Sequence, residues 1–227
     1  MNLSEYELRE KLLKIAGKCF RYRLMAGTWG NLSARLDREK VLITPSGYEK
    51  TALKPEDLLL MDLDGKILRG DLKPTIETSM HLEIYKARDD VNAVIHTHSP
   101  YAMMLSVINE PVPVLTVEFA SAVGHEVPVT KFALPGTKDL ADEVVRALGE
   151  DKMAVLMRNH GVVAVGGSLE EAYNVAILVE EESRTYFWTM LLGRGEVGKM
   201  PAKLVKKMRE FFKESYGQEG RIVLDLE

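Results

Sequence analysis

Three of the five histidines in this chain have the spacing of a transition-metal site. His96 and His98 stand two residues apart at the end of an apolar run, and His160 follows a second apolar run. Side chains at i and i+2 of a strand point to the same face, so His96 and His98 can converge on one ion. Three imidazoles that leave one position open are typical of a catalytic zinc. The alternative is that all three are polar strand ends satisfied by hydrogen bonds.

A metal site that does chemistry also needs a base, and Glu77 is the candidate. It lies at the expected start of a helix over 77–88, just before the strand that carries His96. A helix N-terminus stabilises a carboxylate and offers free backbone N–H groups to an anion. The alternative is that Glu77 is an ordinary first-turn capping residue.

Two glycine-containing turns have the composition of a phosphate cradle. They are Gly-Thr-Trp-Gly-Asn at 27–31 and Thr-Pro-Ser-Gly at 44–47. Each offers hydroxyl or amide donors beside a glycine that permits close backbone approach. Neither matches a P-loop or a dinucleotide fingerprint, so nucleotide binding is not indicated. Turns favour these residue types in any protein, so neither turn decides the function by itself.

Helices that bracket consecutive strands must position these residues, and they favour one α/β domain with a mixed or antiparallel sheet. We expect helices over 4–26, 77–88, 100–107, 139–148, 168–192 and 201–212. We expect strands over 32–36, 41–44, 58–62, 66–68, 91–96, 154–157 and 162–165, and an extended segment over 112–117. Ser4 and Glu7 form a plausible capping box for the first helix.

Composition excludes several classes of function. A net charge of −4 argues against a nucleic-acid partner, and 46% hydrophobic residues in a chain of 227 support a substantial core. The single cysteine, Cys19, excludes a disulfide framework and a thiolate metal site. No apolar run approaches the ~20 residues that span a bilayer, and the N-terminus lacks the order of a signal peptide. We therefore expect a cytoplasmic protein with no membrane partner.

Five motifs, taken in chain order, resemble the class II aldolase/adducin family. They are Gly-Thr-x-Gly-Asn-Leu-Ser at 27–33, Ile-Thr-Pro-Ser-Gly at 43–47, Pro-x-x-Glu at 74–77, His-x-His at 96–98 and Asn-His-Gly at 159–161. The resemblance covers nearly the whole chain. It implies a single layered α/β/α domain over 1–227, with a central mixed, largely antiparallel sheet.

The resemblance also implies an activity and a metal. The enzyme would reversibly split L-fuculose 1-phosphate or a related deoxy-ketose 1-phosphate into dihydroxyacetone phosphate and an aldehyde such as lactaldehyde. One Zn²⁺ per subunit would be bound by His96, His98 and His160, with Glu77 completing the coordination when the site is empty. Zinc would act as a Lewis acid that stabilises the charge left on C3. Glu77 would be the acid/base that moves the proton at that carbon.

The remaining implied residues hold the phosphate or come from another subunit. Those that would hold the phosphate of dihydroxyacetone phosphate are Thr28, Asn31, Ser46, Gly47 and Thr75. The C-terminal tail, about 213–227, carries Tyr216, which would reach a neighbouring subunit's site and assist proton transfer. The resemblance therefore implies a homo-oligomer, a cyclic tetramer.

The chain departs from the aldolases of this family around the aldehyde. Ile76 stands where they commonly present a second serine to the phosphate, and Val117 and Glu118 lie where an aromatic residue is expected. Because of these changes, the resemblance does not specify which aldehyde the enzyme releases. His125 and Glu118 have no assigned role, and we expect His81 to pack behind the site rather than to bind metal.

Three other functions remain open. A ribulose 5-phosphate 4-epimerase uses similar histidines, but typically has aspartate where Glu77 stands. A dehydratase acting on methylthioribulose 1-phosphate would remove water instead of splitting a carbon–carbon bond. An adducin-like binding module would have no catalysis, yet a pure scaffold needs neither three converging histidines nor Glu77.

Overall fold

The structure of the protein is a computed structural model, and it describes residues 4–215. Within this range one sheet of seven strands has the order β4-β3-β2-β1-β5-β7-β6. The strands are β1 (Asn31–Arg35), β2 (Lys40–Ile43), β3 (Leu59–Asp62), β4 (Ile67–Arg69), β5 (Ala93–Thr97), β6 (Ala154–Met157) and β7 (Gly161–Gly166). All neighbouring strands pair antiparallel, and the parallel component is one isolated bridge between Val129 and Leu156. The predicted α/β class with a largely antiparallel sheet is confirmed.

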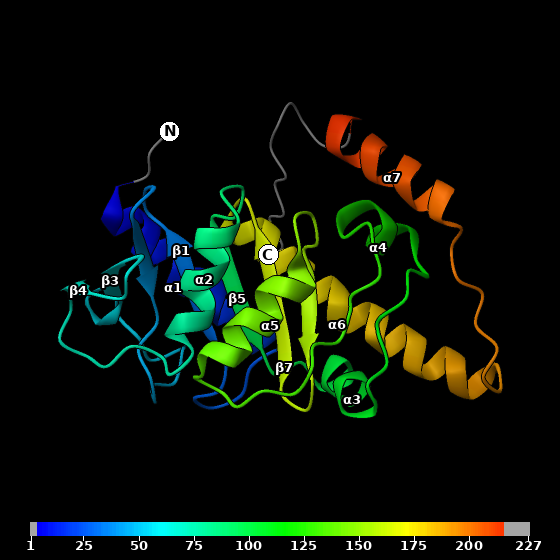
Figure 1. The fold of residues 1–227 in the computed structure, drawn as a ribbon, viewed down its shortest axis with the longest axis horizontal. Coiled ribbons are helices and arrows are strands. Elements are labelled where there is room, and N and C mark those ends of the chain that lie inside the picture. The colour runs from blue at the N-terminus through cyan, green and yellow to red at the C-terminus, as the bar shows by residue number, and fades with distance from the viewer. Residues whose placement is uncertain (1–3, 216–227) are drawn as a thin grey trace.

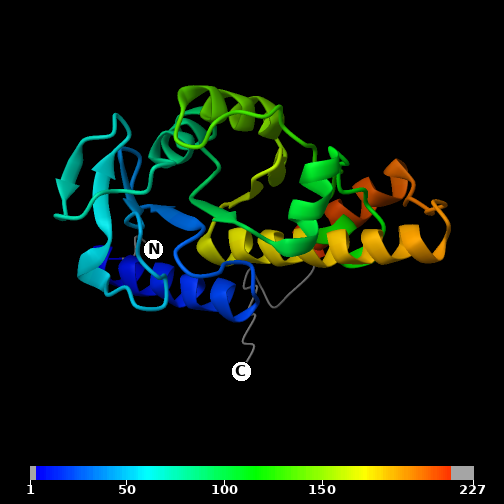
Figure 2. The ribbon, with the colours of Figure 1, turned by 90° about the horizontal axis from the view of Figure 1, so that it is seen from below.

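Helices cover both faces of this sheet (Figures 1 and 2). They are α1 (Glu5–Arg21), the short 3-10 helix η1 (Pro55–Asp57), α2 (Thr78–Ala87), α3 (Pro100–Ile108), α4 (Val117–Ala122), α5 (Lys138–Leu148), α6 (Leu169–Leu192) and α7 (Ala202–Ser215). In the edge-on view of Figure 2, α2 and α5 lie on one face, and α1 and α6 lie on the other. Helices α4 and α7 pack against each other beside α6 (Figure 1). The expectation of one domain over 1–227 stays a prediction.

The alternation of side chains along each strand produces two cores, one on each face. In β5, Val94 packs into the core beneath α2 and α5, whereas Ala93 and Ile95 pack into the core beneath α1 and α6. Successive side chains of a strand point to opposite faces, so a central strand that is apolar throughout must be covered on both sides. The same alternation sends His96 toward α2.

Helix α1 begins where the sequence predicts and ends earlier. Ser4 and Glu7 form the expected capping box. The helix ends at Arg21 rather than at residue 26, because Arg23 takes a left-handed conformation with φ 58° and turns the chain toward the sheet. The backbone N–H groups of Tyr22 and Arg23 bond back to the last turn of the helix.

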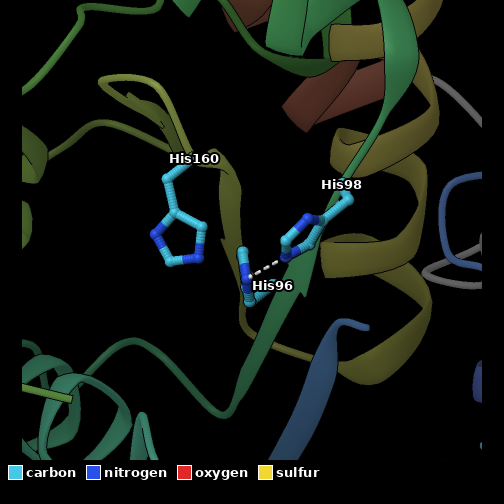
Figure 3. A group of neighbouring side chains, drawn as sticks. All are labelled: His96, His98 and His160. Atoms are coloured by element: carbon cyan, nitrogen blue, oxygen red, sulfur yellow. Dashed lines mark hydrogen bonds between the residues drawn. The ribbon is translucent and has the colours of Figure 1, made fainter. Parts of the chain in front are cut away.

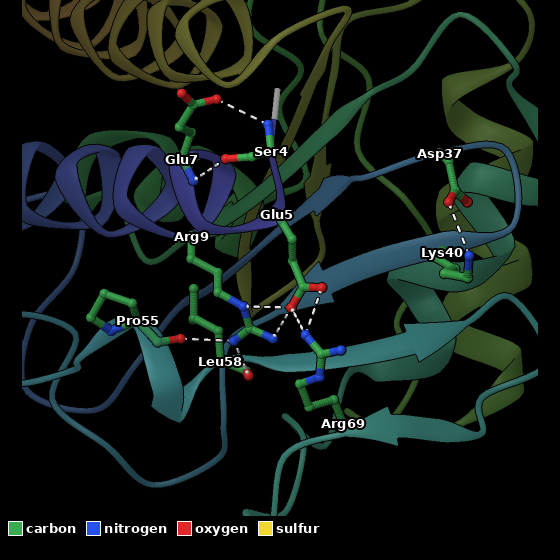
Figure 4. A network of polar contacts seen from close by, with 9 residues as sticks. All are labelled: Ser4, Glu5, Glu7, Arg9, Asp37, Lys40, Pro55, Leu58 and Arg69. Carbon is green, nitrogen blue, oxygen red and sulfur yellow. Dashed lines mark hydrogen bonds and ion pairs between the residues drawn. The ribbon is translucent and has the colours of Figure 1, made fainter. Parts of the chain in front are cut away.

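Arg9 links α1 to the segment that precedes β3 through hydrogen bonds (Figure 4). Its guanidinium is buried and donates to the carbonyl oxygens of Pro55 and Leu58 at 2.7 and 2.6 Å. Glu5 accepts from the same guanidinium and from Arg69 of β4 (Figure 4). This network lies at the β4 edge of the sheet, away from the strand that carries His96.

Helix α4 replaces part of the extended segment that the sequence predicts over 112–117. Val112 forms an isolated bridge with Val127, which fits an extended segment, but Val117 begins a helix whose N-cap is Thr116. The buried carboxylate of Glu182, on α6, accepts hydrogen bonds from the backbone N–H groups of Leu115 and Thr116. A residue 66 positions away in the sequence thus stabilises the start of α4. Helix propensity, which depends on the local sequence, does not predict this contact.

None of the helices formed by residues 4–215 is long and apolar enough to cross a membrane.

Candidate active site

The topology gathers the predicted functional residues at one end of the sheet. Because neighbouring strands run antiparallel, the start of β1 lies beside the ends of β2 and β5, and the start of β7 lies beside the end of β5. Asn31 is the residue opposite His96 across the β1–β5 ladder. His160 ends the turn that leads from β6 into β7.

The three predicted metal ligands point toward one another (Figure 3). His96 Nε2 and His98 Nε2 are 3.0 Å apart, and one nitrogen from each of the three rings lies within 4.8 Å of the others. His96 is fully buried, and the side chain of His160 is 13% exposed. The prediction that these histidines converge matches the geometry.

Glu77 faces the histidines rather than capping its helix. It is the N-cap residue of α2, but its side chain makes no capping hydrogen bond. Glu77 Oε2 lies 3.2 Å from His96 Nε2, and Oε1 lies 3.3 Å from His160 Nε2. Glu77 is 4% exposed, and Oε1 has no hydrogen-bond partner within residues 4–215. The geometry therefore argues against an ordinary capping role for this carboxylate.

The charges of these groups fit a bound cation. Burial lowers the pKa values of His96, His98 and His160 to about 4, so the rings are neutral at pH 7. His96 Nδ1 lies 2.9 Å from Val162 O, and a carbonyl only accepts, so Nδ1 carries the proton and Nε2 presents a lone pair. His96 Nε2 therefore directs its lone pair toward Glu77 Oε2, with no proton of its own between the two atoms. Three imidazoles and a carboxylate are a donor set that transition metals such as zinc accept.

The predicted phosphate residues lie on loops that the backbone ties together. Ser46 N donates to Lys73 O at 2.9 Å, and Thr75 N donates to Thr44 O at 3.2 Å. These bonds hold the loop after β2 against the segment that leads into α2. Thr28 and Gly47 are exposed, whereas Ser46 is half-buried and Thr75 is buried. The prediction that these residues bind phosphate stays a prediction.

Asn31, which was predicted to bind phosphate, also makes hydrogen bonds inside the site. Its Nδ2 donates to Glu77 Oε2 at 2.8 Å, and its Oδ1 lies 2.5 Å from His81 Nε2. One N–H of the amide therefore remains for a phosphate oxygen. Asn31 links the carboxylate of the site to His81, a buried histidine that the sequence predicted to lie behind the site.

Lys50 is a charged residue near the site that sequence reasoning missed. Its side chain is buried, and Nζ donates to Thr28 O at 3.0 Å and to Tyr48 O at 2.8 Å. Thr28 lies in the first glycine-containing turn and Tyr48 directly follows the second, so Lys50 joins the two loops. Burial lowers the pKa of Lys50 to about 8. In the sequence, Lys50 stands three residues after Gly47, and nothing distinguishes it there from an exposed lysine on a loop.

Gly161 is required by the close approach of β7 to Thr97 and His96 of β5. A Cβ at this position would lie 2.3 Å from Thr97 O and 3.1 Å from His96 Cε1. Asn159 just before it has φ 57°, a left-handed conformation that asparagine tolerates better than most residues. The Asn-His-Gly motif therefore turns the chain tightly enough to bring His160 beside His96.

Two predicted or unassigned residues lie elsewhere. Tyr216 lies outside the residues that the structure describes. His125 accepts from the backbone N–H of Met153 at 2.8 Å, at the entry to β6, so it has a structural role. Trp29, which the sequence did not single out, is 65% exposed, and its ring centroid is 5.6 Å from that of His98.

Comparison with known proteins agrees with this geometry. The family model for the class II aldolase and adducin N-terminal domain matches residues 10–187. The chain is 35% identical over 213 residues to a 5-deoxy-D-ribulose 1-phosphate aldolase of Bacillus thuringiensis serovar kurstaki, covering 93% of this chain and 97% of that relative. It is 33% identical over 219 residues to a 5-methylthioribulose-1-phosphate/5-deoxyribulose-1-phosphate aldolase of Rhodospirillum rubrum, covering 96% of each. The solved structure of an L-fuculose 1-phosphate aldolase matches with a TM-score of 0.85 and 36% identity, covering 90% of this chain and 95% of that one.

The chain therefore belongs to the class II aldolase and adducin family. It is an aldolase, an enzyme of the carbon–carbon lyase class, and the non-catalytic adducin-like alternative is set aside.

Proposed function

We propose that this aldolase is zinc-dependent and reversibly splits a deoxy-ketose 1-phosphate with a terminal methyl group. The products would be dihydroxyacetone phosphate and a small aldehyde such as lactaldehyde. The observation that carries the proposal is the position of Glu77, whose carboxylate lies 3.2 and 3.3 Å from two neutral imidazoles and is not used for capping. A carboxylate held next to a metal ion is suited to move a proton at a carbon beside a carbonyl.

Zinc held by His96, His98 and His160 would supply Lewis-acid stabilisation of the charge that develops on the substrate. In the direction of synthesis, Glu77 accepts the proton from the hydroxymethyl carbon of dihydroxyacetone phosphate, and the electron pair of the C–H bond stays on the substrate. In the direction of cleavage, the C4 hydroxyl gives up its proton, a transfer that Tyr216 of a neighbouring subunit would assist, and its oxygen becomes the carbonyl of the departing aldehyde. The electron pair of the C3–C4 bond passes to C3, and Glu77 returns a proton to this carbon.

The two loops around Lys50 would hold the phosphate. The hydroxyl groups of Thr28 and Ser46 and the backbone N–H of Gly47 are donors that suit a phosphate, and Thr75 lies beside the loop after β2. Lys50 adds a positive charge next to them, and it donates to the carbonyl oxygens of Thr28 and Tyr48. Long-range attraction of a dianion by this charge supports a phosphorylated substrate.

The class of aldehyde is proposed from the surroundings of His98 and from the relatives. Trp29 presents an exposed aromatic face 5.6 Å from the His98 ring, which suits an apolar end of the substrate. The Bacillus relative is named for 5-deoxy-D-ribulose 1-phosphate, and the matching structure is named for L-fuculose 1-phosphate. The Rhodospirillum relative is named for 5-methylthioribulose 1-phosphate as well as 5-deoxyribulose 1-phosphate. Each of these sugars ends in a methyl group, which in the methylthio sugar is attached to sulfur.

We also propose that the enzyme is a homotetramer in which Tyr216 of the tail reaches a neighbouring subunit's site. A closed cyclic assembly is the usual way for identical subunits to share a site. Replacing Tyr216 by phenylalanine should slow turnover while zinc content stays the same. Full activity of a monomer in analytical ultracentrifugation would contradict this part of the proposal.

A substrate panel tests the proposed reaction. The zinc-loaded protein is incubated with 5-deoxyribulose 1-phosphate, L-fuculose 1-phosphate and ribulose 5-phosphate. Released dihydroxyacetone phosphate is measured through NADH oxidation by glycerol-3-phosphate dehydrogenase. We expect release from the two ketose 1-phosphates and none from ribulose 5-phosphate. Xylulose 5-phosphate formed from ribulose 5-phosphate would instead indicate an epimerase, and loss of water without triose phosphate would indicate a dehydratase.

A further inference from the structure

A continuous chain of buried polar groups runs from the core to Glu77. Helix α2 contributes Glu77, His81 and Tyr85, which are four residues apart and therefore lie on one face of the helix. Strand β1 contributes Asn31 and Ser33, which point to one face of the sheet. All five are buried, with exposures between 0% and 5%.

The contacts along this chain are short and unbroken. Tyr85 Oη lies 2.9 Å from Ser33 Oγ, which lies 2.6 Å from His81 Nδ1. His81 Nε2 lies 2.5 Å from Asn31 Oδ1, and Asn31 Nδ2 lies 2.8 Å from Glu77 Oε2. Each of these buried donors requires an acceptor, and each buried acceptor requires a donor.

The carboxylate at one end determines the direction of every bond. Glu77 Oε2 accepts, so the Asn31 amide must present Nδ2 to it and Oδ1 to His81. An amide oxygen cannot donate, so the proton of His81 is on Nε2 and Nδ1 is bare. Ser33 must then donate to Nδ1, which leaves Tyr85 as the donor to Ser33. A flipped Asn31 amide would place its oxygen against the carboxylate and its NH₂ group against the N–H of His81, so both neighbours oppose the flip.

The series of hydrogen bonds also gives the two oxygens of Glu77 different surroundings. Oε2 is held by Asn31, whereas Oε1 has no hydrogen-bond partner within residues 4–215 and lies toward His160. An oxygen without a donor is the one able to receive a proton from a substrate.

We propose that His81 is a positioning residue for the proposed aldolase reaction, on which this inference rests. His81 holds the Asn31 amide so that Nδ2 binds Glu77 Oε2, and Glu77 Oε1 is left as the oxygen that exchanges the substrate proton. The proton moves from the hydroxymethyl carbon of dihydroxyacetone phosphate to Oε1, and the electron pair stays on the substrate. His81 touches neither substrate nor metal and acts only through Asn31.

The first test is spectroscopic and needs no substrate. Nitrogen-15 NMR of the metal-free protein, with the His81 signals assigned by comparison with His81→Gln, reports which ring nitrogen carries the proton. We expect the Nε2–H tautomer at pH 7.5. The Nδ1–H tautomer would overturn the proposal, since Nε2 could not then donate to Asn31.

The second test measures proton transfer by itself. Deuterium exchange into dihydroxyacetone phosphate in D₂O, followed by proton NMR, is measured for the zinc-loaded protein and normalised to bound zinc. For His81→Leu we expect the maximal exchange rate to fall by about 10–100-fold, the usual effect of removing a group that orients a residue at a metal site. KM should stay within about threefold, because the proposed phosphate contacts of Thr28, Ser46, Gly47 and Thr75 do not depend on His81. Rates in His81→Gln, whose amide can still donate to Asn31, should lie within about fivefold of the parent rate.

Matched variants separate positioning from general loss of packing. Ile84→Val removes a buried methylene from the same helix outside the polar chain, and we expect the parent rate per bound zinc. Ser33→Ala frees His81 to take the other tautomer, so its rate should lie between those of the parent and His81→Leu. His81→Leu with the rate of Ile84→Val would overturn the proposal. If His81→Leu fails to fold, a parent-like rate in Ser33→Ala together with an Nδ1–H tautomer overturns it.

The outcome also separates this inference from the proposed reaction. If the parent protein with zinc exchanges no proton of dihydroxyacetone phosphate, the proposed function is wrong. The tautomer of His81 still decides whether the polar chain has the direction argued above.

Discussion

The neutral Nε2 of His96 lies 3.2 Å from a carboxylate oxygen of Glu77, so this contact lacks the charge of an ion pair. The other nitrogen of His96 donates to Val162 O, which holds the ring with its lone pair toward Glu77 and His98. Orientation of a metal-binding histidine through its second nitrogen is common and increases its basicity. Most of the testable consequences for this enzyme follow from this arrangement.

Metal binding should stabilise the fold through His96. In the parent protein, zinc at about 100 times its Kd should raise the free energy of unfolding by about 2.7 kcal/mol. His96→Ala should lose most of this increase, because it removes the most buried of the three imidazoles. Denaturant unfolding with and without zinc, together with the zinc content of the purified variant, measures the effect. An unchanged zinc-dependent increase in His96→Ala would show that the ion binds elsewhere.

Glu77→Gln should separate metal binding from proton transfer. Glutamine keeps the size of the side chain and one oxygen, so we expect zinc to remain bound. Exchange of the substrate proton should fall by about 10²–10⁴-fold, the usual contribution of a positioned base. Exchange in D₂O and zinc content are measured on the same sample. A rate close to that of the parent enzyme would exclude Glu77 as the base.

Lys50→Met should weaken phosphate binding rather than chemistry. The variant removes a positive charge and two hydrogen bonds that join the loops at Thr28 and Tyr48. We expect KM for the ketose 1-phosphate to rise about 10-fold with kcat changed by less than about threefold, the pattern of lost uniform binding. Lys40→Met is the matched control, since Lys40 begins β2 at the opposite end of the strand from the loop that follows Ile43. An equal rise in KM in both variants would contradict a local role for Lys50.

The metal-free protein should lose stability as the pH falls below neutral. Burial lowers the pKa of His81 to about 3 from an ordinary value of 6.5. Below pH 6.5 His81 is therefore protonated in the unfolded chain, whereas in the folded chain it stays neutral until the pH falls to about 3. The free energy of unfolding then decreases with falling pH, by up to about 1.4 kcal/mol per pH unit for each such histidine. Urea titrations between pH 7.5 and 5 measure the slope, which should be shallower in His81→Gln.

Gly161→Ala should disturb the metal site through the backbone. A methyl group would lie 2.3 Å from Thr97 O, so β7 would have to move away from β5 and take His160 with it. We expect a loss of about 1–3 kcal/mol of stability, typical of overpacking, together with weaker zinc binding. Gly17→Ala is the contrasting control, because a Cβ there meets nothing within 4 Å inside α1. This control should gain up to about 1 kcal/mol from helix propensity.

The sequence by itself determined the alternation of helices and strands and the candidate ligands. Apolar runs ending in His96 and before His160 identified two strand ends, and a strand places His96 and His98 on one side by geometry alone. Local rules suffice here because side-chain direction repeats every two residues in a strand and every three to four in a helix. Spacing likewise located Ser4 and Glu7 at the start of α1.

Only the tertiary structure decided how these parts act on one another. Burial of the Asn31 amide between Glu77 and His81 depends on packing α2 against β1, which a linear pattern does not contain. The same holds for Lys50, whose charge is placed by contacts with carbonyls up to 22 residues away, and for α4, whose start depends on Glu182. Hydrogen-bond direction and desolvation depend on neighbours distant in the chain, so they appear only when the sheet has brought its strand ends together.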